Sequence, residues 1–333
     1  MDLDASESWL PMDDGAQIFL RRWPAPGKPE GAAPKAVLHI VHGMAEHSAR
    51  YARLAGRLGA QGIEVIAADQ RGHGETACKR NDSGKGGLLG HCADGDGFAR
   101  VCSDIDIINK TIKKERPGLP LFLLGHSWGS FIAQNYIERY EGRPAASGDE
   151  GVNLAGCILS GTRGPSNAVN ITLGAPVMAF MAFFLGQRNG STAAKAMADG
   201  PYNKCFRPNR TAVDWLSRDE KEVDAYVADP FCGKLCSTGF YRDMALALKR
   251  IHRPAEMEKI RKTLPIYIVS GSADPVGDMG ESPAALAVAY RHLGIKDLET
   301  VLYPDARHEP LNETNREEVQ ESLLDWLLRH CNN

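Results

Sequence analysis

The chain has almost no excess of charge of either sign. Its 333 residues include 39 Lys and Arg against 42 Asp and Glu, which leaves a formal net charge of −3. Nucleic acids and strongly anionic membranes bind basic surfaces, and this composition supplies no basic excess. We therefore expect no nucleic-acid partner. The composition gives no indication of the oligomeric state.

Long apolar runs are also missing. The most apolar stretch, residues 171–185, is shorter than the ~20 residues that cross a bilayer, and Pro176 interrupts it. The first seven residues, MDLDASE, are acidic and contain no apolar core of a signal peptide. These absences predict a cytoplasmic protein without a signal peptide or transmembrane helix, at most peripheral to a membrane.

Motifs for cofactors are absent too. We find no glycine-rich dinucleotide fingerprint, no phosphate loop and no cluster with metal-ligand spacing. Eight cysteines are scattered along the chain, a pattern that favours reduced thiols over a disulfide framework. Cys232 and Cys236 have no second ligand pair nearby, so they do not indicate a zinc site. We expect no cofactor and no metal.

One short motif, GHSWG at residues 125–129, stands out against these absences. It follows an apolar run at 121–124 and precedes a helix-compatible run at 130–136. The order is strand, sharp turn and helix, with Ser127 at the apex of the turn. The flanking glycines allow the helix backbone to approach the strand closely. Since a helix N-terminus directs free N–H groups toward an anion, the motif predicts a nucleophilic serine.

A serine nucleophile needs a histidine base, and the base needs an orienting carboxylate. Asp274 follows the apolar run 265–270, and His308 follows the apolar run 298–303. Both residues thus come just past the carboxyl end of a predicted strand, at the edge where open α/β sheets carry their sites. The chain order and this placement predict a Ser127–Asp274–His308 triad.

Five motifs in order make the chain resemble the α/β-hydrolase family. Within that family it is most similar to the monoglyceride lipase and lysophospholipase branch, whose members are S33-type serine aminopeptidase relatives. The motifs occupy residues 42–51, 69–76, 125–129, 271–275 and 308–309. The resemblance implies an α/β-hydrolase fold, with a mostly parallel eight-stranded sheet, helices on both faces and an inserted helical cap.

The same resemblance assigns the oxyanion donors. The residue after the nucleophile, Trp128, supplies one backbone N–H, and by resemblance Met44 supplies the other. Trp128 is bulkier than the residue often found at this place, and Ser130 stands where the family often has glycine.

Four residues offer alternative interpretations. Asp305 is a rival to Asp274, but an acid three residues before His308 more simply turns the loop. We interpret His126 as packed against the core. His42 and His47 are interpreted as hydrogen-bonded structural residues, with a role in supporting the oxyanion loop as the alternative.

Strand-like and helix-like runs alternate, as in a parallel sheet with helices on both faces, except between residues 162 and 240. We therefore divide the chain into an α/β-hydrolase core, residues 1–161 and 241–333, and a helical cap, residues 162–240. The apolar run of the cap predicts substrate binding by Phe180, Phe183 and Phe184. Ordinary packing, or a lid face that contacts a membrane surface transiently, are its alternatives.

The sequence as a whole indicates a serine carboxylic-ester hydrolase. The favoured substrates are single-chain lipid esters, monoacylglycerol or lysophospholipid-like, cleaved through an acyl-enzyme. The alternatives are a small-ester carboxylesterase or a serine aminopeptidase, which would need cap carboxylates for a substrate ammonium, and a non-catalytic ligand-binding relative. The acids available for an ammonium are Asp219, Glu220, Glu222 and Asp224.

Overall fold

Eight strands form one sheet in the part of the chain that the computed structural model describes, which is residues 4–25, 33–78, 88–143, 151–165 and 169–331. Their order is β1-β2-β4-β3-β5-β6-β7-β8. β1 and β2 form an antiparallel hairpin and β2 runs antiparallel to β4, whereas all other neighbours are parallel. The strands are β1 (Ser6–Pro11), β2 (Gln17–Trp23), β3 (Ala36–Val41), β4 (Ile63–Asp69), β5 (Leu121–His126), β6 (Gly156–Ser160), β7 (Ile266–Gly271) and β8 (Leu298–Tyr303).

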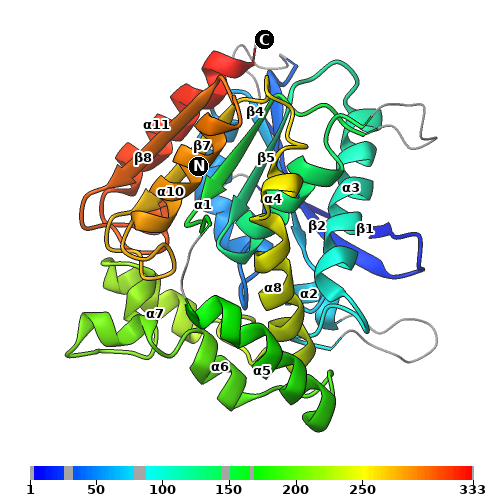
Figure 1. Ribbon diagram of the computed structural model, residues 1–333. Helices are drawn as coiled ribbons and strands as arrows, with labels where there is room; N and C mark the ends of the chain where they lie inside the picture. The colour runs from blue at the N-terminus through cyan, green and yellow to red at the C-terminus, as the bar shows by residue number, and fades with distance from the viewer. Residues whose placement is uncertain (1–3, 26–32, 79–87, 144–150, 166–168, 332–333) are drawn as a thin grey trace.

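The central strands are buried on both faces. Every residue of β3, β4, β5, β6 and β7 is buried, which explains their nearly continuous apolar sequences. Helices α1 (Ala52–Gly59) and α11 (Arg316–His330) cover one face. Helices α3 (Gly97–Glu115), α4 (Trp128–Arg139), α8 (Thr238–Ile251) and α10 (Glu281–His292) contribute to the core on the other. The predicted α/β-hydrolase architecture is confirmed (Figure 1).

The predicted cap contains helices and no strand among its described residues. Figure 1 shows α5, α6 and α7 gathered beyond one end of the sheet. The predicted cap, residues 162–240, contains α5 (Val169–Leu185), α6 (Thr192–Ala198) and α7 (Glu220–Ala228), with 3₁₀ helices η3 (Tyr202–Phe206) and η4 (Asp214–Leu216). Within the described ranges, none of the helices has the length and apolarity that a membrane span requires.

Candidate active site

Ser127 occupies a strained turn between β5 and α4. Its backbone lies at φ 53° and ψ −123°, a conformation that side-chain-bearing residues rarely adopt. A Cβ at Gly125 would come within 2.3 Å of the Gly129 carbonyl oxygen, and one at Gly129 within 2.1 Å of the Val41 carbonyl oxygen. Only glycine fits at these two positions, so strand and helix can approach closely and present the serine at the end of β5.

The structure brings the three predicted triad residues together. His308 Nε2 lies 2.7 Å from Ser127 Oγ, and His308 Nδ1 lies 3.0 Å from each carboxylate oxygen of Asp274. Asp274 and His308 are buried, with 0% and 1% of their surface exposed. A neutral imidazole that donates from Nδ1 to Asp274 keeps Nε2 free to accept the serine proton. This geometry suits general-base activation of Ser127.

Burial and charge act in opposite directions on the base. Burial favours the neutral ring of His308, but the charge and hydrogen bond of Asp274 outweigh it and raise the pKa of His308 above its usual 6.5. Asp274 is itself held in place, because the Val276 N–H donates to its Oδ1 at 2.9 Å. The acid thereby both orients the imidazole and stabilises its protonated form.

The rival acid and the neighbouring histidine lie outside this relay. Asp305 is exposed, and its backbone N–H donates to Ser272 Oγ at 2.9 Å. His126 Nδ1 pairs with Ser160 Oγ at 3.2 Å. Burial, together with the nearby His308, lowers the pKa of His126 to about 4, so its ring is neutral.

The other two histidines support the loop after β3. The Gln70 N–H donates to His42 Nε2 at 3.0 Å, and His47 Nε2 lies 2.8 Å from Asp229 Oδ2. Both side chains are buried. Their hydrogen bonds fit the structural interpretation, and His47 also connects the loop to the cap.

Met44 and Trp128 border the same cavity as Ser127. Neither backbone N–H has an acceptor among the hydrogen bonds between described residues. Two free amides beside a nucleophile are the arrangement that an oxyanion needs. The predicted oxyanion roles of Met44 and Trp128 stay predictions, and this arrangement supports them.

A buried ionic network lies behind the oxyanion loop. Glu46 Oε1 accepts a hydrogen bond from the Gly43 N–H at 2.5 Å, and Arg50 contacts Glu46 at 2.6 Å. Arg50 also forms two 2.8 Å bonds to the carboxylate of Glu309, next to His308. Burial alone would raise the pKa of Glu46, but Arg50 lowers it to about 2. The sequence analysis missed this network, although Glu46 and Arg50 belong to the motif at 42–51.

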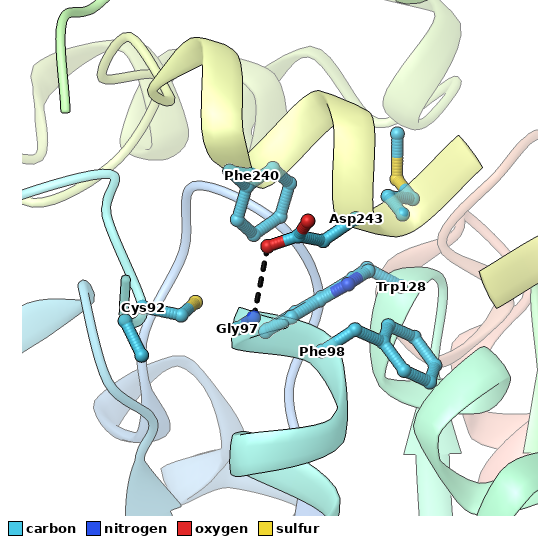
Figure 2. A pocket seen from close by; sticks show the side chains of 8 residues that line it. Cys92, Gly97, Phe98, Trp128, Phe240 and Asp243 are labelled. Atoms are coloured by element: carbon cyan, nitrogen blue, oxygen red, sulfur yellow. Dashed lines mark hydrogen bonds between the residues drawn. The ribbon is translucent and has the colours of Figure 1, made fainter. Parts of the chain in front are cut away.

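The bulky Trp128 side chain packs inward rather than filling the cavity. Only 2% of Trp128 is exposed, and its ring lies 4.8 Å from Phe240 and 5.4 Å from His73. Figure 2 shows the indole beside Phe240 and Phe98, with Gly97 bonded to Asp243 close by. Nucleophile and α8 are thus connected through one aromatic cluster.

Ser130 also has a role in the turn. Its Oγ lies 2.6 Å from the Ser127 carbonyl oxygen and 2.8 Å from Thr162 Oγ1. The hydroxyl ties the first turn of α4 to the segment that follows β6. This contact explains what a serine does where the family often has glycine.

A cavity of about 740 Å³ opens at Ser127. Much of its wall is apolar and comes from α4, α5, α6 and α8. These apolar lining residues are Phe131, Val177, Met178, Met197, Ala198, Met244, Ala245 and Leu248. Arg163, Asp199, Tyr202 and Asp278 add polar groups to the lining. Arg163 donates to the Val276 carbonyl at 2.8 Å and to Asp278 at 2.6 Å, so its charge is already paired.

Phe180, Phe183 and Phe184, which the sequence predicts to bind substrate, do not line this cavity. Their side chains lie on the outer face of α5, with 63%, 81% and 65% of the residue exposed. Among the side chains described on this helix, residues 176–185, Met178 and Ala182, one helical turn apart, are buried. Residues 173–185 of α5 are all apolar, so the sequence has no polar pattern there to indicate which side packs inward.

One group of side chains has metal-ligand chemistry in the described part of the chain. Donor atoms of His47, Asp229 and Cys232 lie within 4.8 Å of one another. An imidazole, a carboxylate and a thiol are ligands that zinc accepts. The group lies between the oxyanion loop and the cap, and includes none of the triad residues.

Comparison with known sequences identifies the family. Residues 32–315 match the family described as serine aminopeptidase, S33. The chain belongs to this family. The S33 match spans every motif from the oxyanion loop to His308, and the sheet order places the chain among the α/β-hydrolases.

Several curated relatives of this S33 chain are named as lipases. It is 29% identical over 300 residues to a monoacylglycerol lipase of Mycolicibacterium smegmatis, covering 89% of both chains. It is 30% identical over 270 residues to human monoglyceride lipase, covering 80% of this chain and 72% of the relative. Among solved structures, a thermostable carboxyl esterase from Bacillus coagulans superposes with a TM-score of 0.83 at 26% identity, covering 98% and 99% of the two chains. The chain is a serine ester hydrolase of the α/β-hydrolase fold.

Proposed function

We propose that the S33 chain hydrolyses esters of single-chain lipids, such as monoacylglycerols or lysophospholipids. The observation that carries this proposal is the cavity of about 740 Å³, which joins Ser127 to an apolar wall built by α4, α5, α6 and α8. Cavities of roughly 300–1,000 Å³ hold drug-sized ligands. The names of the curated relatives support the same substrate class.

The chemistry follows from the proposed roles of the triad. His308 removes the Ser127 proton as Oγ bonds to the ester carbonyl carbon, and Asp274 stabilises the resulting imidazolium. The backbone N–H groups of Met44 and Trp128 receive the oxyanion. His308 then protonates the departing alcohol. Water, deprotonated by the same histidine, releases the fatty acid from the acyl-enzyme.

The aminopeptidase alternative finds less support in the cavity. An aminopeptidase binds the charged amino terminus of a peptide, and this ammonium group needs an unpaired carboxylate beside the nucleophile. None of Asp219, Glu220, Glu222 and Asp224 lines the cavity. Asp199 and Asp278 do line it, but they pair with Lys195 and Arg163. An apolar wall without a free carboxylate fits an acyl chain better than an ammonium group.

The proposal includes transient contact of α5 with a lipid surface. Phe180, Phe183 and Phe184 contact one another, with ring centroids 4.4 and 5.1 Å apart, and are otherwise exposed. This exposed aromatic cluster lies on the same helix as Val177 and Met178, which line the cavity. Such an arrangement suits an enzyme whose substrate resides in membranes. We also propose a cytosolic location, which the eight cysteines support because all are free.

Hydrolysis of a p-nitrophenyl ester series from acetate to palmitate tests the proposal, followed by monoacylglycerol and lysophosphatidylcholine. We expect turnover that peaks at medium or long chains and disappears in Ser127→Ala. Filling the cavity by Ala245→Trp should abolish palmitate hydrolysis and spare acetate. Leu246→Trp is the matched control, since Leu246, the next residue on α8, is 49% exposed and does not line the cavity. Turnover restricted to acetate in the wild type would contradict the lipid-ester proposal.

A further inference from the structure

The backbone carbonyl of Ala45 joins the oxyanion loop to the cap. The Tyr226 hydroxyl donates to this carbonyl at 3.0 Å, and the Gly233 N–H donates to it at 2.9 Å. Ala45 comes directly after Met44, whose N–H is the proposed oxyanion donor. Tyr226 belongs to α7 and Gly233 to the segment that follows it, so both donors come from the cap. Two cap groups therefore hold one atom beside the catalytic centre.

The conformation of Ala45 explains why it needs holding. Its φ is 55°, in the left-handed region that costs an alanine energy and that glycine adopts freely. Ala45 is buried, so a carbonyl without donors would also lack water. The two cap donors stabilise a backbone geometry that alanine would otherwise leave. A change of φ at Ala45 would rotate the Met44–Ala45 peptide. This rotation would shift the backbone of Met44 and, with it, the Met44 N–H.

The core holds the other parts of the same loop. Glu46 fixes the Gly43 N–H, and Arg50 fixes Glu46. On the cap side, Asp229 pairs with His47 at 2.8 Å, and the guanidinium of Arg50 lies 4.9 Å from the centre of the Tyr226 ring. The core thus anchors Gly43 and Glu46, on either side of Ala45, while the Ala45 carbonyl and His47 are held from the cap side.

From this arrangement we infer that Tyr226 is a positioning residue for the oxyanion hole. The inference rests on the proposed function, because it assumes that Met44 donates to the oxyanion. A contact that aligns an oxyanion donor stabilises the transition state and leaves ground-state binding unchanged. Removing the Tyr226 hydroxyl should therefore lower kcat and leave KM unchanged, equally for short and long esters. Cavity-wall changes, in contrast, affect long esters selectively.

The variant Tyr226→Phe tests this inference. Loss of a whole oxyanion donor costs ~10²–10³ in rate, and a displaced donor should cost less, about 10-fold in kcat. The concentration of active sites is titrated with a fluorophosphonate. The value of kcat is then calculated per active site, and misfolded protein does not lower it. A trifluoromethyl ketone, whose adduct with Ser127 carries an oxyanion, should bind about 10-fold more weakly. Tyr290→Phe is the matched control, because it removes a buried tyrosine hydroxyl on α10 with no partner among the described residues.

Asp229→Asn provides a second variant if Tyr226→Phe folds poorly. It keeps the side-chain shape but removes the charge facing His47, and should produce a smaller loss in the same two quantities. An unchanged kcat with unchanged ketone affinity, or a rise in KM alone, would overturn the inference. Labelling of Ser127 by the fluorophosphonate depends on the same oxyanion donors, but it involves no carboxylic-ester substrate. It therefore tests Tyr226 even if lipid esters are not hydrolysed and the proposed function fails.

Discussion

The surroundings of Ser127 and the outer face of α5 follow opposite rules. Around the nucleophile, polar side chains are buried and paired, from His308 with Asp274 to Arg50 with Glu46 and Glu309. On α5, large apolar side chains are exposed and contact mainly each other. Paired polar groups fix the geometry of the first region, and the second has the exposed apolar surface that we propose contacts a lipid. The comparison teaches that the catalytic groups and the surface proposed to contact lipid lie on separate parts of one chain.

The largest expected effect is a loss of catalytic activity on substitution in the region around Ser127. Asp274→Asn should lower kcat by ~10⁴, because the amide no longer orients the imidazole or stabilises its charged form. Only the neutral imidazole accepts a proton, so wild-type kcat/KM should rise as pH increases through a pKa above 6.5. Loss of the Asp274 charge lowers that pKa, and the acid limb should move to lower pH.

The matched control for that experiment is Asp305→Asn. Asp305 is exposed and not bonded to His308 in the described structure, so rate and pH profile should stay those of the wild type. A loss of activity in Asp305→Asn equal to that in Asp274→Asn would reverse the assignment of the acid. Binding to lipid vesicles should be unaffected in both variants, because α5 is unchanged.

A second experiment compares stability in the two regions with the same substitution. Leu124→Ala in β5 removes a fully buried side chain and should cost about 2–5 kcal/mol of unfolding free energy. Leu185→Ala at the end of α5 removes a side chain that is 50% exposed, and should change stability by roughly 0.5 kcal/mol or less. Denaturant unfolding of the two variants measures both values. Equal losses would show that α5 packs as core and that its outer face is not exposed apolar surface.

The smallest expected effect concerns the lipid surface. The double variant Phe183→Ser with Phe184→Ser should bind neutral phospholipid vesicles roughly 10-fold more weakly, because less apolar area enters the membrane interface. Hydrolysis of p-nitrophenyl acetate in solution should not change, since neither residue lines the cavity. Val227→Ser on α7, 59% exposed, is the control for loss of an exposed apolar side chain elsewhere in the cap. Identical sedimentation with vesicles for the wild type, the double variant and Val227→Ser would contradict the proposal that α5 contacts the lipid surface.

Much of the fold could be predicted from the sequence because its signals are local. Strands such as β3 and β5 are buried on both faces and read as unbroken apolar runs. The turn at Ser127 requires glycines two residues before and after it, and these lie between a strand-like and a helix-like run in this sequence. Asp274 and His308 each follow a strand end, so their approach to Ser127 could be predicted from the topology of a parallel sheet.

What the sequence did not reveal depends on long-range contacts. Tyr226 and Ala45 are 181 residues apart, and no local pattern indicates that a hydroxyl meets that carbonyl. Glu309 was visible beside His308, but its pairing with Arg50, 259 residues away, was not. The orientation of α5 failed for a different reason. Residues 173–185 of this helix are all apolar, so periodicity could not distinguish Met178 from Phe180.

The bond between cap and Ala45 also sets a rule for engineering. Caps are natural segments to exchange between related hydrolases, because they enclose the space that selects the substrate. A graft replacing residues 162–240 would remove both donors to the Ala45 carbonyl along with the old cavity wall. A chimaera that restores a hydroxyl and an amide at this carbonyl should keep its turnover number while its substrate range changes. A chimaera that omits these two donors should show the new substrate range with a lower turnover number.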